Sequence, residues 1–451
     1  MAERLPKPGH FVNTQAKISN RYKRDMMEGN HLSRSIISSL LSCRHMKVLT
    51  FAWDYPPETT GGLGMACHGL VSELGAYCDI TFVLPRRQRV SPSRCNFIFA
   101  DVLESTTKSE TNVTVGTYSQ SDTVVRYYSQ KLEKMIYGPL FEAARAFADR
   151  AHVIAQTANH DLIHAHDWSS YLAGMAAKAA SGKPLVIHVH ATAYDQAGGG
   201  SVDPQIFAIE QHAFAVADSI AVVSNYTKTI LVERYCVDPE KIEVVYNGAE
   251  VSTPIYYEPS LCELKAAGKR IVLYHGRITI QKGLDHLIRA ARLVVDTDPN
   301  VLFIVSGSGD MEAQIMQQVG ELGLSENVRF AGALWYEERD RMYQSADLVV
   351  MPSVSEPFGL VPLEAIRYGT PVIVSKQSGV AEVLQHALKV DFWDVEEMAN
   401  KILAASRYPI MYEQLKREST LELLKVTWHR AAEVVRSLYE KLTTKLQQTF
   451  A

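Results

Sequence analysis

Two glutamates separated by seven residues form the most specific chemical pattern in the chain. Glu356 and Glu364 flank the segment Pro-Phe-Gly-Leu-Val-Pro-Leu, which follows a predicted buried strand at 347–351 and opens a predicted helix at 360–368. The first N–H groups of a helix favour a phosphate or a polarised sugar oxygen. We therefore expect Glu356 to point into a ligand cleft and Glu364 to lie about one turn inside the helix. The simpler alternatives are that Glu356 caps the helix and that Glu364 lies on a solvated face of it.

A pair of cations follows another predicted strand. The strand at 271–275 ends in the segment His-Gly-Arg, so Arg277 lies at its carboxyl end, and Lys282 follows just before the next helix. Arginine binds phosphate oxygens through a planar fork, and lysine adds a point charge. Together these two side chains could neutralise a leaving diphosphate without a metal ion. The alternative is a pair of solvated surface cations.

Glycines follow the first predicted strand, in the segment Thr-Thr-Gly-Gly-Leu-Gly at 59–64. Without side chains, Gly61 and Gly62 let the backbone approach a ligand closely, and the helix that follows offers its N-terminus to an anion. The spacing matches neither the dinucleotide fingerprint nor a Walker loop. A tight turn into the helix explains this segment equally well.

Polar residues end two further strands of the first half. His164 and His166, followed by Asp167, end one strand, and His188 and His190 end the next. Residues two apart on a strand share a face, so His188 and His190 could bind a metal together. No matching carboxylate spacing accompanies them, and we favour polar contacts with a sugar and no metal site. Buried core histidines are the alternative for His164 and His188.

These groups need a scaffold that brings the ends of several strands together. From Met46 onward, short β-branched runs alternate with helical patterns, which is typical of doubly wound α/β domains with parallel sheets. The pattern weakens after residue 248 and restarts at 271, so two Rossmann-like domains are predicted, facing a central cleft at the carboxyl ends of their strands. The predicted parts are an extension at 1–45, a first domain at 46–250, a second domain at 251–426 and a closing helix at 427–451.

Length and composition limit the function classes. A chain of 451 residues is too long to fold around a single hydrophobic core. Its net charge of −4 provides no positive potential that would attract nucleic acid. The short cluster Arg86, Arg87 and Arg89 is a solvated loop or, alternatively, a peripheral contact with phosphate or a membrane surface. The stretch 86–128, rich in Ser and Thr, is predicted to be an irregular insertion or a hairpin.

Six cysteines without a Cys-x-x-Cys pair predict reduced thiols, and they indicate neither a zinc cluster nor a redox site. No apolar run approaches the length that spans a bilayer, and the polar start of the chain lacks a secretory signal. We therefore expect a cytoplasmic protein. The oligomeric state is not defined by these patterns.

Taken together, these residues resemble the retaining glycosyltransferases of family 4, which share the two-domain GT-B fold with glycogen and starch synthases. The resemblance runs from about Met46 to Lys445. The matching elements are the glutamate pair, the Gly276-Arg277 and Lys282-Gly283 segments, the Gly-Gly-Leu loop, His166-Asp167-Trp168, His190, Val223-Ser224-Asn225 and the closing helix at Thr427-Trp428.

The resemblance implies roles in donor binding. Arg277 and Lys282 would hold the donor diphosphate, and the loop at Gly61 and Gly62 would approach the phosphates. Glu364 would bind the ribose hydroxyls. The closing helix would cross back to the first domain, as it does in the family.

The resemblance also implies roles around the sugar. Glu356 would contact the donor sugar, and His190 would touch it from the first domain, while Asp167 would lie near the acceptor. The backbone that would lie beside the sugar belongs to Phe358, Gly359 and Leu360.

One departure bears on the substrate. Bacterial glycogen synthases that resemble this chain carry Lys in the first loop, where Thr59 stands here. This puts glycogen synthesis from ADP-glucose in doubt but leaves an α-glucan product open.

The expected reaction transfers a hexosyl unit, with glucose as first choice, from a nucleotide-diphosphate sugar to a hydroxyl of a glycan or small-molecule acceptor. Retention is expected, and neither a metal nor another cofactor is needed. One alternative is an isomerase similar to nucleotide-sugar 2-epimerases, which needs no acceptor. The other is a non-catalytic scaffold, which the presence of all key motif residues disfavours.

Overall fold

The computed structural model describes residues 46–58, 61–102, 138–250 and 256–449. The expectations for the extension at 1–45 and for Thr59, and most of the predicted insertion, lie outside these residues.

The first half of the described chain forms a seven-stranded sheet in which every neighbouring pair runs parallel. Its order, β3-β2-β1-β4-β5-β6-β7, reverses direction between β1 and β4. β4 and β5 are buried at every position, because helices cover both faces of a parallel sheet. The strands are β1 (Met46–Phe51), β2 (Cys78–Leu84), β3 (Asn96–Phe99), β4 (Leu162–His166), β5 (Leu185–Val189), β6 (Ser219–Val222) and β7 (Ile242–Val244).

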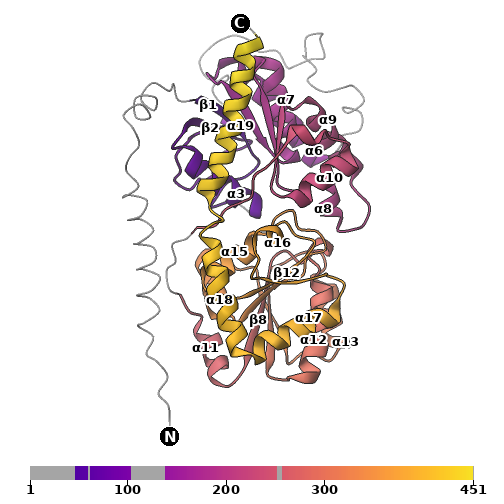
Figure 1. The fold of residues 1–451 in the computed structure, drawn as a ribbon. Coiled ribbons are helices and arrows are strands. Elements are labelled where there is room, and N and C mark those ends of the chain that lie inside the picture. The colour runs from indigo at the N-terminus through magenta and orange to yellow at the C-terminus, as the bar shows by residue number, and fades with distance from the viewer. Residues whose placement is uncertain (1–45, 59–60, 103–137, 251–255, 450–451) are drawn as a thin grey trace, which may run out of the picture. The chain divides into compact units, whose positions relative to one another are not determined.

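Helices pack on both faces of this first sheet (Figure 1). Alanines and large apolar residues of α6, α7 and α9 fill one hydrophobic cluster, and α3 contributes to a second cluster on the other face. The helices and turns are α3 (Gly62–Leu74), η1 (Ala100–Val102), α6 (Pro139–Thr157), α7 (Trp168–Ser181), α8 (Ala193–Ala197), α9 (Pro204–Val216), α10 (Asn225–Tyr235) and η2 (Pro239–Lys241).

The second half repeats the same plan with six parallel strands in the order β10-β9-β8-β11-β12-β13, which reverses between β8 and β11. The strands are β8 (Arg270–His275), β9 (Val301–Ser306), β10 (Val328–Gly332), β11 (Leu348–Met351), β12 (Val372–Ser375) and β13 (Leu388–Val390). The helices are α11 (Pro259–Ala266), η3 (Ile280–Lys282), α12 (Leu284–Thr297), α13 (Glu312–Glu321), α14 (Tyr336–Ser345), α15 (Leu360–Arg367), α16 (Val380–Val383), α17 (Val395–Arg407) and α18 (Pro409–Leu423).

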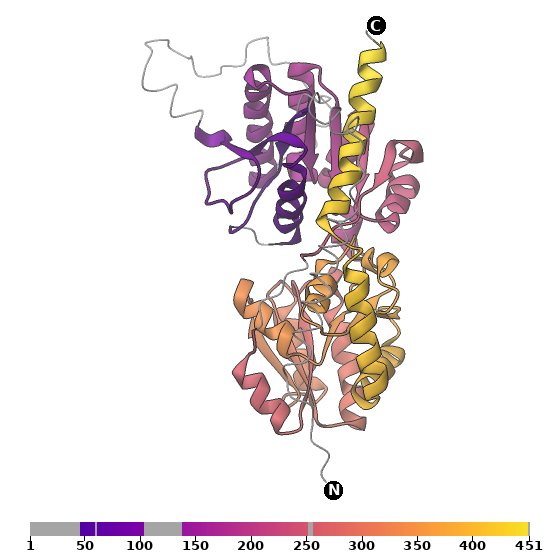
Figure 2. The same ribbon diagram turned by 60° about the vertical axis from the view of Figure 1, so that its left-hand side comes forward.

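The last helix, α19 (Trp428–Thr449), returns to the first domain and packs against α3, as both ribbon views show (Figures 1 and 2). Its residues Val435 and Tyr439 lie in the same hydrophobic cluster as β1 and β2. A Cβ atom on Gly69 of α3 would lie 2.2 Å from the Trp428 ring, so only glycine permits this approach. The predicted crossing of the closing helix is therefore confirmed.

Two segments differ from the sequence-based prediction. The stretch predicted as an irregular insertion or a hairpin contains β3, a short edge strand that pairs parallel to β2. Its partial burial hides the alternation that identifies strands. The segment between residues 248 and 271, where the predicted pattern weakens, contains α11, in which Leu261 is the buried residue. With so small an apolar face, this helix gives little periodic signal.

Candidate active site

A single cavity of about 680 Å³ is lined by residues that follow the strands of both sheets, and its size suits a ligand of drug-like dimensions. In each sheet, the strand order reverses where the lining loops emerge, after β1 and β4 in the first and after β8 and β11 in the second. Crevices at such reversals are the usual ligand sites of doubly wound sheets. The sequence-predicted residues that line the cavity are Gly61, Gly62, Asp167, His190, Arg277, Lys282, Glu356, Phe358, Gly359, Leu360 and Glu364.

Lys282 and Glu356 form an ion pair in the wall of this cavity. The Lys282 Nζ atom lies 2.6 Å from Glu356 Oε2, and the two side chains are 19% and 11% exposed. Ser353 donates its hydroxyl to the same carboxylate oxygen at 3.0 Å. The lysine charge is therefore balanced by Glu356 when no donor is bound, and an incoming diphosphate would compete for it.

The positive charge of Arg277 is more accessible to a ligand than that of Lys282. Its side chain is exposed, and among the described residues it pairs with no carboxylate. One guanidinium nitrogen donates to Gln281 Oε1 at 3.2 Å, and Gln281 in turn donates to the Ser355 carbonyl at 3.1 Å. The Tyr274 hydroxyl holds the Arg277 carbonyl at 2.6 Å. These contacts orient the guanidinium without neutralising it.

Glu364 is held by two residues of α14. Its Oε1 atom accepts a hydrogen bond from Arg339 Nη1 at 3.1 Å, and its Oε2 atom accepts one from the Tyr343 hydroxyl at 2.9 Å. Each carboxylate oxygen keeps a further lone pair that can accept a ligand hydroxyl. Sequence reasoning missed Arg339 and Tyr343, which both lie on α14. Nothing local in that helix shows which way its polar side chains point.

The turn before α15 requires glycine. Gly359 has a φ of +102°, which side chains rarely adopt, and a Cβ there would lie 3.0 Å from Met351 Sδ and 3.2 Å from Glu356 Cγ. The helix starts at Leu360 and the residues of this turn line the cavity. The first N–H groups of α15 are thus available to an anion or a sugar oxygen.

Asp167 holds the loop that carries His190. It has a φ of +58° although it is not glycine, a strained geometry of the kind found at functional sites. Its Oδ1 atom accepts the N–H groups of His190 at 2.6 Å and Ala191 at 3.2 Å. Burial raises the pKa of Asp167 to about 7, although these two hydrogen bonds favour the charged form.

Two more buried carboxylates continue this pattern along the loop. The N–H of Thr192 donates to Asp195 at 2.8 Å, and the N–H of Ala193 donates to both oxygens of Glu210 at 3.1 Å. Burial raises the pKa of Asp195, and it raises that of Glu210 to about 8. Asp195 also accepts the Ser355 hydroxyl at 2.6 Å, which ties the His190 loop to the residue before Glu356.

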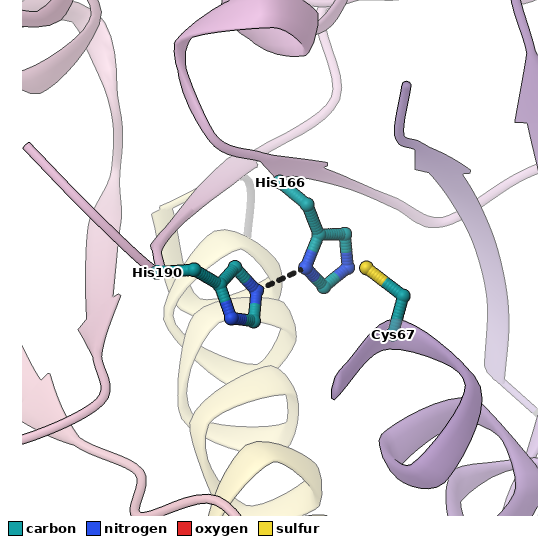
Figure 3. A group of neighbouring side chains, drawn as sticks. All are labelled: Cys67, His166 and His190. Carbon is teal, nitrogen blue, oxygen red and sulfur yellow. Dashed lines mark hydrogen bonds between the residues drawn. The ribbon is translucent and has the colours of Figure 1, made fainter. Parts of the chain in front are cut away.

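The four strand-end histidines do not share one environment. His190 lines the cavity, whereas the side chains of His164, His166 and His188 are fully buried. Burial lowers the pKa of each of these imidazoles, so they are neutral. The expected sugar contact therefore fits the position of His190 alone, and the alternative of core histidines is correct for His164 and His188. The Nδ1 atom of His166 lies 3.0 Å from Nε2 of His190. Figure 3 draws this hydrogen bond as a dashed line.

Two family models match this chain. Residues 60–253 match the model described as Glycosyltransferase Family 4, and residues 263–421 match the model described as Glycosyl transferases group 1. The chain therefore belongs to this family of glycosyltransferases. It is an enzyme. The first model matches most of the part of the chain that forms the first sheet, and the second model matches the part that forms the second sheet.

Individual proteins agree with this assignment. An uncharacterized glycosyltransferase of Methanocaldococcus jannaschii is 28% identical over 356 residues, which cover 76% of this chain and 83% of that protein. A glycogen synthase of Mycobacterium tuberculosis is 27% identical over 352 residues, covering 75% and 80%. The structure of Anabaena HepE in complex with UDP and glucose superposes with a TM-score of 0.65 at 19% identity, covering 89% of this chain and 100% of HepE. The fold is GT-B, as the resemblance predicted.

Two further findings concern membrane-spanning helices and the cysteines. None of the helices in the described part of the chain combines the length and the apolar content that a membrane crossing requires. The described cysteines form no disulfide with one another: Cys67, Cys78, Cys95, Cys236 and Cys262.

Proposed function

We propose that this glycosyltransferase moves a hexosyl unit, with glucose as first choice, from a nucleotide-diphosphate sugar to a hydroxyl of a glycan or small-molecule acceptor. Transfer proceeds with retention and without a metal ion. The observation that carries the proposal is the convergence of Arg277, Lys282 and the N-terminus of α15 on one cavity with Glu356 and Glu364. Positive charge from side chains and a helix terminus suits a diphosphate. The glucose in the HepE complex supports glucose as the sugar to test first.

The mechanism is electrostatic. Arg277 stabilises the charge that grows on the leaving diphosphate, and Lys282 exchanges its contact with Glu356 for a phosphate oxygen. Glu356, released from the lysine, accepts a hydroxyl of the donor sugar. The acceptor attacks from the face that the diphosphate leaves, and a leaving oxygen takes the acceptor proton, so no dedicated base is required.

The first domain orients the sugar in this proposal. His190 approaches it from a loop whose successive N–H groups are bound by buried carboxylates, and the bond between Asp195 and Ser355 fixes this loop against Glu356. Asp167 lies on the acceptor side of the cavity. A loop held in this way keeps His190 oriented before the donor arrives, which lowers the reorganisation that the reaction needs.

The proposal is tested in two steps. UDP-, ADP- and GDP-glucose are first screened for thermal stabilisation, because a ligand that binds only the folded state raises its melting temperature. The best donor is then incubated with candidate acceptors, and the anomeric configuration of the product is assigned by NMR. Retention supports the proposal. An inverted product contradicts the mechanism, and conversion of the donor sugar without any acceptor would show an isomerase instead.

A further inference from the structure

Beneath the cavity of the first domain, four imidazole rings and one thiol are packed together. His164 and His166 come from β4, and His188 lies on β5 with His190 just beyond its end; their ring centroids lie 4.2–5.3 Å apart. Cys67, which is fully buried, approaches this group from α3, and Figure 3 shows its sulfur beside the ring of His166.

Most of these ring nitrogens lack partners. Within the described part of the chain, five buried nitrogens have no hydrogen-bond partner: His164 Nε2, His166 Nε2, both nitrogens of His188, and His190 Nδ1. A buried polar atom without a partner costs about 1–3 kcal/mol. Native proteins bury few such groups, and a cluster of them indicates an occupant such as a bound ion or water.

We propose that Cys67, His166 and His190 form a binding site for Zn²⁺. One ligand atom from each of these residues lies within 4.8 Å of the others. A thiolate with two neutral imidazoles is a common zinc ligand set, and it leaves a fourth position open. On binding, the Cys67 thiol releases its proton to solvent and the sulfur donates an electron pair to the ion.

The ligand atoms lie within 4.8 Å of one another and must move closer to bind one ion. Tetrahedral coordination at zinc bond lengths places ligand atoms roughly 3.3–3.7 Å apart. The facing nitrogens, His166 Nδ1 and His190 Nε2, already lie 3.0 Å apart and bond to each other, whereas His166 Nε2 and His190 Nδ1 have no partner. A flip of either ring presents an unpartnered nitrogen to the ion. The outer rings provide support. His164 is fixed by the Tyr439 hydroxyl of α19 at 2.7 Å, and the His188 ring stacks against His190.

Occupation of this site would inhibit transfer. This consequence rests on the proposed function, in which His190 contacts the donor sugar, because a ring nitrogen bound to Zn²⁺ cannot also bind a hydroxyl. His190 lines the cavity, so the ion has a route from the donor site to the ligands. The proposed zinc ligands, Cys67, His166 and His190, differ from the residues proposed to hold the diphosphate, Arg277 and Lys282.

The test of the site measures metal binding by the full chain. The protein is freed of metal with a chelator, and Zn²⁺ is titrated by calorimetry. Co²⁺ is then substituted, because a cobalt–thiolate bond gives a charge-transfer absorption. One ion per chain and this absorption are expected. Cys67→Ala should abolish the absorption and weaken Zn²⁺ affinity by about 100-fold or more, since even residues that only support a metal ligand contribute 10- to 100-fold.

Cys78→Ala is the matched control, because Cys78 is a buried thiol of the same hydrophobic cluster that lies outside the proposed ligand set. It should bind Zn²⁺ like the unmodified chain. Absence of stoichiometric binding by the unmodified chain would overturn the site and leave buried water as the occupant. Equal binding by both cysteine variants would place the ion elsewhere and would overturn it as well.

A second measurement separates the site from the proposed function. Micromolar Zn²⁺ should inhibit transfer by the unmodified chain, EDTA should restore it, and Cys67→Ala should resist inhibition while keeping its activity. If the chain transfers no sugar at all, the calorimetric and cobalt results still decide the zinc site. Conversely, full activity with one ion bound at Cys67 would refute the inhibitory consequence.

Discussion

The Nζ atom of Lys282 lies 2.6 Å from Oε2 of Glu356, across 74 residues of sequence. The side chain proposed to meet the diphosphate and the one proposed to meet the sugar therefore neutralise each other before the donor binds. Their environment is largely shielded from water, which strengthens the attraction between them. Donor binding must break or share this contact, so the two residues should respond to mutation as a unit.

Lys282→Met and Glu356→Gln should therefore show non-additive effects on turnover. Lys282→Met removes a charge that is proposed to meet the leaving group, and it should lower kcat by roughly 10²–10³. In the double variant, no buried carboxylate is left without its cation, and the loss should be smaller than the product of the two single losses. Steady-state kinetics of the four proteins measure this. Lys265→Met is the control, because Lys265 pairs with Asp347 outside the cavity. Independent effects of Lys282 and Glu356 would refute the proposed exchange.

Arg277→Ala and Glu364→Gln should separate chemistry from donor affinity. Arg277 is proposed to meet charge that grows in the transition state, so its loss should lower kcat by about 10²–10³. Glu364 is proposed to bind ribose, which does not change during the reaction, so its variant should mainly raise the donor KM. Arg289→Ala provides a control, since Arg289 is exposed on α12 and pairs with Asp285. If kcat survived in Arg277→Ala but collapsed in Glu364→Gln, the two assignments would have to be exchanged.

Activity should survive chelation. Because Arg277 and Lys282 are proposed to supply the positive charge, EDTA should leave the initial rate of transfer unchanged, or raise it where traces of Zn²⁺ are bound at Cys67. Rates are compared in EDTA, in EDTA with excess Mg²⁺, and after dialysis. Loss of turnover in EDTA that Mg²⁺ or Mn²⁺ restores would show that the metal-free mechanism is wrong.

Glu210→Gln should flatten the dependence of stability on pH. Burial, reinforced by the charges of Asp167 and Asp195, raises the pKa of Glu210 from 4.5 to about 8, against hydrogen bonds from Tyr235 and from the N–H of Ala193. Folding thus favours the protonated acid, and this contribution is lost as pH rises from about 4.5 through about 8. The glutamine keeps the shape of Glu210 but cannot ionise.

The measurement for Glu210 is the melting temperature across the same pH window. The advantage of Glu210→Gln over the unmodified chain should grow as pH rises from about 5 to about 9. Glu233→Gln, a change at an exposed position of α10, should show no such trend. A constant difference at all pH values would mean that Glu210 ionises normally in the folded protein.

A chain that begins at Met46 should fold and bind the donor. The described sheets and hydrophobic clusters start at β1, and each of the cavity residues lies beyond it. Circular dichroism and thermal stabilisation by the best donor measure the outcome, with the full chain as reference. An insoluble product, or one that folds but fails to bind, would show that residues 1–45 contribute to the core or to the site.

The sequence by itself determined the architecture and the ends of the strands. Buried parallel strands are continuous apolar runs, which can be recognised locally, and the carboxyl ends of such strands gather at one edge of a sheet. Arg277 lies two residues after β8 and Glu356 five residues after β11, and these two strands are neighbours, so their place in the cavity could be predicted. The edge strand β3 could not, because it is short and only partly buried.

Only the tertiary structure decided which side chains pair. The bonds of Glu356 to Lys282, of Glu364 to Arg339, and of Asp195 to Ser355 join positions 74, 25 and 160 residues apart. From the local sequence pattern alone, Lys282 could equally have been a solvated surface cation and Glu356 a helix-capping carboxylate. Likewise, the same strand-end spacing leaves His190 in the cavity and buries His166, because burial depends on which helices cover the strand end. Side-chain direction and long-range contact are set by packing, and local sequence carries little information about either.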